Sequence, residues 1–128
     1  MPLYRRSTLL LLLLLAVTAV RAEDAAVVAS RSPGDLSDQE RALMMQSAND
    51  YNACVFKQAM AEAKAKKDGD IRHIADVAMG LCQSGLDELK ASIASWGFED
   101  YFAEGFTRTV RDRAAHKLLP ELAVELGR

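Results

Sequence analysis

The sequence has only two cysteines, Cys54 and Cys82, and it lacks the short motifs in which cysteine is usually reactive. Redox pairs usually occur as Cys-x-x-Cys at the start of a helix, whereas residues 55–81 separate these two. The absence of Cys-x-x-Cys-His excludes attachment of a c-type haem. The two histidines, His73 and His116, form no local catalytic signature with serines or acids. We therefore expect a protein that is not an enzyme and that binds no cofactor.

Long apolar runs are also scarce. The longest, residues 9–20, follows Arg5 and Arg6 and leads into Val20-Arg21-Ala22. A membrane-spanning helix needs about 20 apolar residues, so this run is short for an anchor, and no cysteine follows it for lipid attachment. The order of basic, apolar and small residues is typical of a secretory signal peptide. We predict a signal peptide over residues 1–22, with Val17-Thr18-Ala19 as an alternative cleavage site, and a periplasmic or secreted mature protein.

The mature chain lacks the positive charge that nucleic-acid-binding proteins carry. The sequence has 16 Lys and Arg against 18 Asp and Glu, and removal of residues 1–22 takes away three arginines and no acid. The net charge of residues 23–128 is then 13 − 18 = −5. An acidic domain is a poor candidate for binding nucleic acid. At this length we expect one domain, in the size class that exported proteins often reinforce with a disulfide.

No segment alternates apolar and polar residues as a half-buried strand does, so the predicted class is all-α. Residues 23–36 lack a sustained period and contain Pro33-Gly34, which predicts a flexible linker before a helical domain over residues 37–128. Ser37-Asp38-Gln39-Glu40 has the spacing of a capping box and predicts the start of the first helix. Its apolar positions recur at steps of three and four, at Met44, Ala48, Tyr51, Val55 and Ala59, flanked by Met45, Phe56 and Ala63.

Asp68-Gly69 predicts the turn that ends the first helix, and Asp70 can cap a second one. We expect the second helix to run without interruption to Trp96. Its apolar stripe consists of Ile71, Ala75, Ala78, Cys82, Gly85, Leu89, Ile93 and Trp96. Gly85 indicates either close helix packing or a kink at Gln83-Ser84-Gly85, because glycine weakens a helix interior.

A third helix is expected from about Glu99, after the stop signal of Gly97. Its apolar residues are Phe102, Phe106, Val110, Ala114 and Leu118. Pro120 is expected to interrupt it, and residues 120–126 then predict a short fourth helix with proline in its first turn. The predicted architecture is a small antiparallel bundle of three to four helices.

Cys54 and Cys82 lie at equal distances along the chain from Asp68, in the predicted turn. Two antiparallel helices that reverse there bring the two sulfur atoms level. We therefore expect a structural disulfide that staples the helical hairpin, with free thiols or intermolecular pairing as the alternatives. A loop of this size contributes roughly 3 to 4 kcal/mol by the chain-entropy model.

The third predicted helix carries the one local basic cluster of this acidic chain: Arg108, Arg111, Arg113, His116 and Lys117. Arg108 and Arg111 are three residues apart and can together contact a carboxylate or a phosphate. A solvated face near the negative end of the helix dipole is the alternative interpretation. We expect a non-enzymatic interaction protein whose partner is another protein, contacted by these two arginines.

The alternative function is a small-ligand or metal-binding carrier. Thioethers and imidazoles suit copper, and the chain offers Met44, Met45, Met60, Met79, His73 and His116. No two of these residues form a recognised ligand spacing, and methionine is an ordinary core residue. We expect no metal site.

The pattern Tyr51-x-x-Cys54, Ile74-Ala75-Asp76-x-Ala78-x-x-x-Cys82 and Leu118-Leu119-Pro120 resembles that of small exported α-helical proteins of proteobacteria whose function is uncharacterised. The resemblance covers residues 49–126. It implies a disulfide-linked helical hairpin and a periplasmic location, and it carries no active site to this chain.

Overall fold

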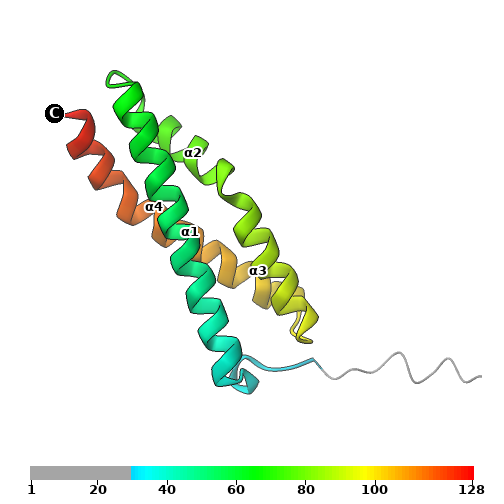
Figure 1. Ribbon diagram of the computed structural model, residues 1–128. Coiled ribbons are helices and arrows are strands. Elements are labelled where there is room, and N and C mark those ends of the chain that lie inside the picture. Colours follow the sequence, from blue (N-terminus) through cyan, green and yellow to red (C-terminus); the bar gives the residue numbers. More distant parts are fainter. Residues whose placement is uncertain (1–29) are drawn as a thin grey trace, which may run out of the picture.

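A computed structural model describes residues 30–128, so the predicted signal peptide lies outside the described residues. Four α-helices follow a short 3-10 helix, η2 (Pro33–Asp35). They are α1 (Asp38–Ala65), α2 (Ile71–Leu81), α3 (Gln83–Ser95) and α4 (Asp100–Leu126). α1 and α4 run in the same direction. α2 followed by α3 runs in the opposite direction, from the C-terminal end of α1 to the N-terminal end of α4 (Figure 1). The prediction of an all-α antiparallel bundle is confirmed, and no described helix is long and apolar enough to cross a membrane.

Both predicted helix starts in the first half of the domain are confirmed by their hydrogen bonds. The Ser37 hydroxyl accepts from the Glu40 N–H at 3.1 Å, and the Glu40 carboxylate accepts from the Ser37 N–H at 2.9 Å. At α2, the Asp70 carboxylate accepts from the N–H groups of His73 and Arg72, which lower its pKa. These side chains satisfy N–H groups that have no partner within the helix.

The turn before Asp70 requires glycine for a steric reason. A Cβ atom on Gly69 would lie 2.9 Å from both the Ile74 Cδ1 atom and the Lys66 carbonyl oxygen. Ile74 is 1% exposed, so its side chain has no free space to move into. The reversal from α1 into α2 is thus possible because residue 69 has no side chain.

The predicted continuous second helix is wrong, because it is broken at Cys82. This residue has φ −99° and ψ 2°, and it ends α2 and precedes α3. The break lies one residue before the kink considered at Gln83-Ser84-Gly85. Gly85 is exposed, and a Cβ atom added there would meet no neighbouring atom within 4 Å, so close packing does not explain this glycine. The buried stripe continues across the break through Cys82, Leu86, Leu89 and Ile93.

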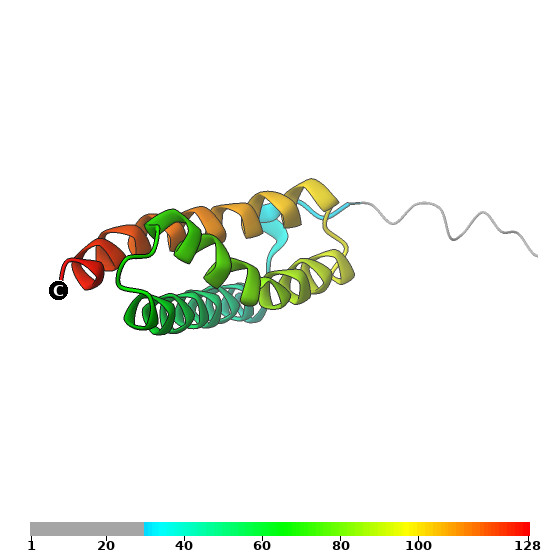
Figure 2. The same cartoon turned by 90° about the horizontal axis from the view of Figure 1, so that it is seen from above.

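The break at Cys82 changes the direction of the apolar stripe that α2 and α3 share. α2 and α3 meet at an angle beside α1 (Figure 1), and in the view from above α2 crosses from the side of α4 towards the side of α1 and α3 (Figure 2). The buried residues form two clusters. Ile74, Ala75 and Ala78 of α2 belong to the larger one, and Leu89 and Ile93 of α3 to a smaller one with Phe98.

The predicted fourth helix over residues 120–126 is also wrong, because α4 continues through Pro120. Proline has no N–H to donate to the carbonyl of residue 116, and such a position in a helix interior is normally unfavourable. Pro120 is exposed, whereas Leu118 and Leu122 on the same helix are 2% and 0% exposed. Burial of Leu118 and Leu122 stabilises the turns before and after Pro120 as one continuous helix.

In its described part, the linker predicted over residues 23–36 is attached to the bundle by Arg31. The Arg31 N–H donates to the Gly97 carbonyl at 3.1 Å, and its guanidinium makes two hydrogen bonds to Glu40, of 2.7 and 2.9 Å. The guanidinium carbon also lies 4.5 Å from the centroid of the Phe98 ring. Gly97 has φ 92°, a conformation that glycine adopts without strain.

The Arg31–Glu40 pair makes stability depend on acid pH. The Arg31 guanidinium, aided by the Ser37 N–H, lowers the pKa of Glu40 to about 2 from 4.5. A carboxyl with a lowered pKa in the folded state stabilises it above its unfolded pKa, and this contribution is lost as pH falls towards about 2. We expect Glu40→Gln to be less stable than wild type at neutral pH, with the difference shrinking between about pH 5 and pH 2.

Urea unfolding at a series of pH values measures this dependence. Glu88→Gln serves as the control, because Glu88 forms no ion pair within residues 30–128. Parallel stability curves for wild type and Glu40→Gln across the acid range would contradict the prediction.

Candidate interaction site

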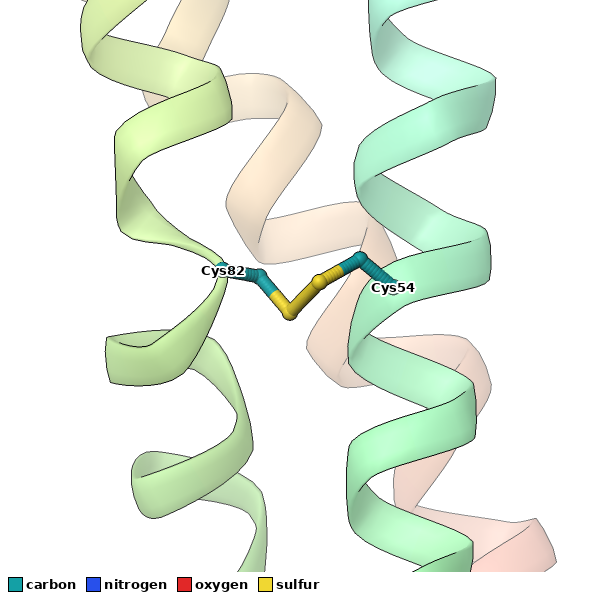
Figure 3. Close-up of a disulfide and its surroundings, with 2 residues drawn as sticks. All are labelled: Cys54 and Cys82. Carbon is teal, nitrogen blue, oxygen red and sulfur yellow. A yellow bond between two sulfur atoms is a disulfide. The ribbon is translucent and has the colours of Figure 1, made fainter.

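The predicted disulfide is present and joins the middle of α1 to the break between α2 and α3 (Figure 3). The Cα atoms of Cys54 and Cys82 are 6.0 Å apart, within the normal range for a disulfide. Cys82 is 4% exposed and Cys54 is half-buried. The bond therefore fixes the hairpin, and the structure describes no free cysteine.

Arg108 and Arg111 are both exposed on α4 and line one hollow of about 230 Å³ between α3 and α4. Gln83 and Leu86 of α3 form its other side, and Thr107 of α4 also lines it. Arg111 also lines a second hollow, of about 450 Å³, beside Gly80 and Gln83 at the break between α2 and α3. Asp76 and Asp112 line this hollow as well. The structure thus brings the two predicted contact residues together at the surface where α4 faces that break.

One acidic side chain beside this pair is already neutralised from another helix. Glu104 also lines the smaller hollow, and the Lys90 ammonium lies 3.0 Å from its carboxylate. This hydrogen bond is the main cause of the lowered pKa of Glu104, and the charge of Arg108 makes the smallest contribution. Arg108 and Arg111 are therefore not the primary partners of Glu104.

None of the five basic residues in the α4 cluster forms an ion pair within residues 30–128. The cations that do form ion pairs there are Arg31, Lys66, Lys67, Lys90 and Arg128. All five residues of the cluster are instead exposed, including Arg113, His116 and Lys117. The positive charge of these side chains is available to an external anion.

A second site, which the sequence did not predict, is an apolar groove between α1 and α4. Its volume is about 620 Å³. Its lining consists of Asn52, Val55, Phe56, Ala114, Lys117, Leu118, Pro120 and Glu121. The sequence predicts Phe56 and Met45 beside the buried face of α1, yet they are 48% and 59% exposed. Phe56 directly follows the buried Val55 and so lies about 100° further around the helix, which is the local signal for its exposure.

Asn52 gives the groove a polar atom without a partner. Its Oδ1 atom is buried and accepts no hydrogen bond in the described structure. The buried Tyr51 hydroxyl, on the neighbouring side of α1, is likewise without a partner there. Burial raises the pKa of Tyr51, and the charge of Arg111 opposes this shift. Buried polar atoms usually have hydrogen-bond partners, so these two atoms are exceptions within the described structure.

The side chains considered for metal binding do not converge. Met44 is buried in the smaller core cluster, whereas Met60 and Met79 pack against the larger one. Met45, His73 and His116 are exposed at separate places. Within residues 30–128 there is no group of three or more His, Cys, Asp or Glu side chains that could hold a metal ion.

Comparisons with protein-family models, with curated proteins and with solved structures returned no match. The resemblance to exported proteobacterial proteins therefore remains an expectation from the cysteine pattern. The two candidate interaction features of this chain are Arg108 with Arg111 on α4 and the groove between α1 and α4.

Proposed function

We propose that this chain is a non-enzymatic interaction protein that binds an acidic protein partner through Arg108 and Arg111. The supporting observation is that the basic cluster of α4 takes part in no ion pair within residues 30–128, although the chain has more acids than bases. Arginine binds carboxylates with two parallel hydrogen bonds, and two arginines three residues apart on a helix can act on one acidic segment.

We also propose that the protein is exported to the periplasm or secreted, and that its mature form begins at Glu23. The signal-like residues 1–22 and the Cys54–Cys82 disulfide support this location, since disulfides persist outside the reducing cytosol. The intact mass of the exported protein checks it. A mass that still includes residues 1–22, or a reduced pair of cysteines in the exported form, would argue against this location.

An acidic partner is favoured over nucleic acid because of the charge balance. The mature chain would carry 13 − 18 = −5, so a polyanion would meet repulsion over most of the surface. A protein partner needs to be acidic only where it contacts α4. The exposure of Arg108 and Arg111 allows this local contact without rearrangement of the bundle.

The test is charge reversal at both positions. We expect Arg108→Glu with Arg111→Glu to lose the partners that wild type retains after crosslinking in the exported compartment, because the change places two acids opposite an acidic surface. Arg41→Glu with Arg72→Glu is the matched control, since both arginines are exposed, lie outside α4 and form no ion pair in the described structure. Retention of the same partners by the α4 variant, with normal helical content, would remove the proposal.

A small-ligand carrier is the second candidate, and the groove between α1 and α4 is the observation that favours it. Its volume, about 620 Å³, lies within the usual range for ligand pockets, and its lining is largely apolar. A carrier purified under native conditions should retain an added mass. A native mass spectrum of the exported protein separates this candidate from the first.

A further inference from the structure

We infer that a second copy of this chain covers the α1–α4 groove, so that the protein is a homodimer with a two-fold axis beside Phe56. This inference concerns a different face of α4 from Arg108 and Arg111 and does not depend on their role. Two features of the groove support it, and each is complementary to itself, which is what a two-fold interface requires.

The first feature is shape. Phe56 stands at the edge of the groove and is 48% exposed, whereas Val55 and Leu118 in the groove are 1% and 2% exposed. A projecting aromatic ring and an apolar hollow therefore lie next to each other on one surface. A two-fold axis between them places each Phe56 in the groove of the other subunit, so both insertions form together. Buried aromatic anchors of this kind are typical centres of interfaces.

The second feature is charge. Lys117 and Glu121 lie one turn apart on α4 and both line the groove, and neither forms an ion pair within residues 30–128. When two α4 helices meet antiparallel about a two-fold axis, Lys117 can face Glu121 of the partner subunit, and the reverse pair forms at the same time. A face with both signs of charge complements a copy of itself, unlike the basic face that carries Arg108 and Arg111.

The apolar surface also extends beyond the groove along both helices. Met45 is 59% exposed and lies on the same stripe of α1 as Asn52 and Phe56, at steps of seven and four residues. Val124 is 54% exposed and follows Pro120 by one turn on α4. Met45 and Val124 therefore add exposed apolar area on the two helices that form the groove.

Sedimentation of the full mature protein over a range of concentrations tests the inference. We expect wild type to sediment as a dimer and Phe56→Asp to dissociate at least about tenfold more readily, because a charge then replaces the central anchor. Leu81→Asp is the control, since Leu81 is 64% exposed on α2, away from the groove. Because Phe56 is exposed, the variant should keep wild-type helical content.

Charge exchange provides a second and sharper measurement. Lys117→Glu alone should weaken the dimer, and Lys117→Glu combined with Glu121→Lys should restore it, because the reciprocal pairs are rebuilt with the signs exchanged. A role of Lys117 within one subunit does not predict this recovery. Three outcomes would overturn the inference: a wild-type monomer at every concentration, a dimer insensitive to Phe56→Asp, or a native monomer that carries a small-molecule mass which Phe56→Asp removes.

Discussion

The thermal midpoint of unfolding is expected to fall by ten degrees or more when Cys54→Ser is combined with Cys82→Ser. Loss of a native disulfide from a small domain typically costs about 2 to 5 kcal/mol, which is comparable to the whole net stability of many such domains. For a domain of this size, each kcal/mol corresponds to roughly 4 to 8 °C in the midpoint.

The position of the disulfide in the fold is the reason to expect a value in the upper part of this range. It connects α1 to Cys82, where the backbone leaves helical geometry between α2 and α3. There the Cys82 N–H donates to the Ala78 carbonyl and the Cys82 carbonyl accepts from the Gly85 N–H, so the covalent link restrains the junction between two short helices. Helical content should nevertheless survive, because the capping residues and the buried stripes of the helices are unchanged.

Thermal melts followed by circular dichroism measure the effect. Reduction of the wild-type protein is the control, since it breaks the bond without burying a serine hydroxyl at the position of Cys82. Variant and reduced wild type should melt together and below the oxidised protein. A double variant that melts with the oxidised protein would mean that packing alone holds the hairpin.

The second large effect is expected at Leu122, beyond Pro120. Leu122 is 0% exposed and belongs to the larger core cluster. Replacement of a buried leucine by alanine removes apolar contacts and leaves a cavity, at a cost of about 2 to 5 kcal/mol. We expect Leu122→Ala to lower the thermal midpoint by about 8 °C or more.

Leu81→Ala is a matched control, because the same substitution is made at a side chain that is 64% exposed. It should change the midpoint by only about a degree or two, as exposed substitutions do. If Leu122→Ala behaved like Leu81→Ala, the last turns of α4 would contribute little to the core, and the separate short helix expected from Pro120 would describe this end of the chain better.

The elements that the sequence alone determined are those with local causes. Three of them depend only on hydrogen bonds between residues close in sequence, so the neighbouring residues predict them. These are the Ser37–Glu40 capping box, the Asp70 cap and the Asp68-Gly69 turn. The pairing of Cys54 with Cys82 followed from the same local turn, because a hairpin that reverses at Asp68-Gly69 leaves these two residues level.

The tertiary structure decided the features that depend on residues distant in the chain. Arg31 is held by Gly97 and Phe98, which no local pattern connects to it. The continuity of α4 through Pro120 reflects burial of Leu122 in a core built from several helices, which offsets an unfavourable local residue.

The candidate site divides in the same way. The spacing of Arg108 and Arg111 was visible in the sequence. Only the tertiary structure shows that neither arginine forms an ion pair within residues 30–128 and that Glu104 is paired with Lys90 of α3. The groove with Asn52 and Phe56 exists only where α1 and α4 meet, since both helices contribute to its lining. A surface made by two segments so far apart in the chain has no signature in either of them, and only their packing creates it.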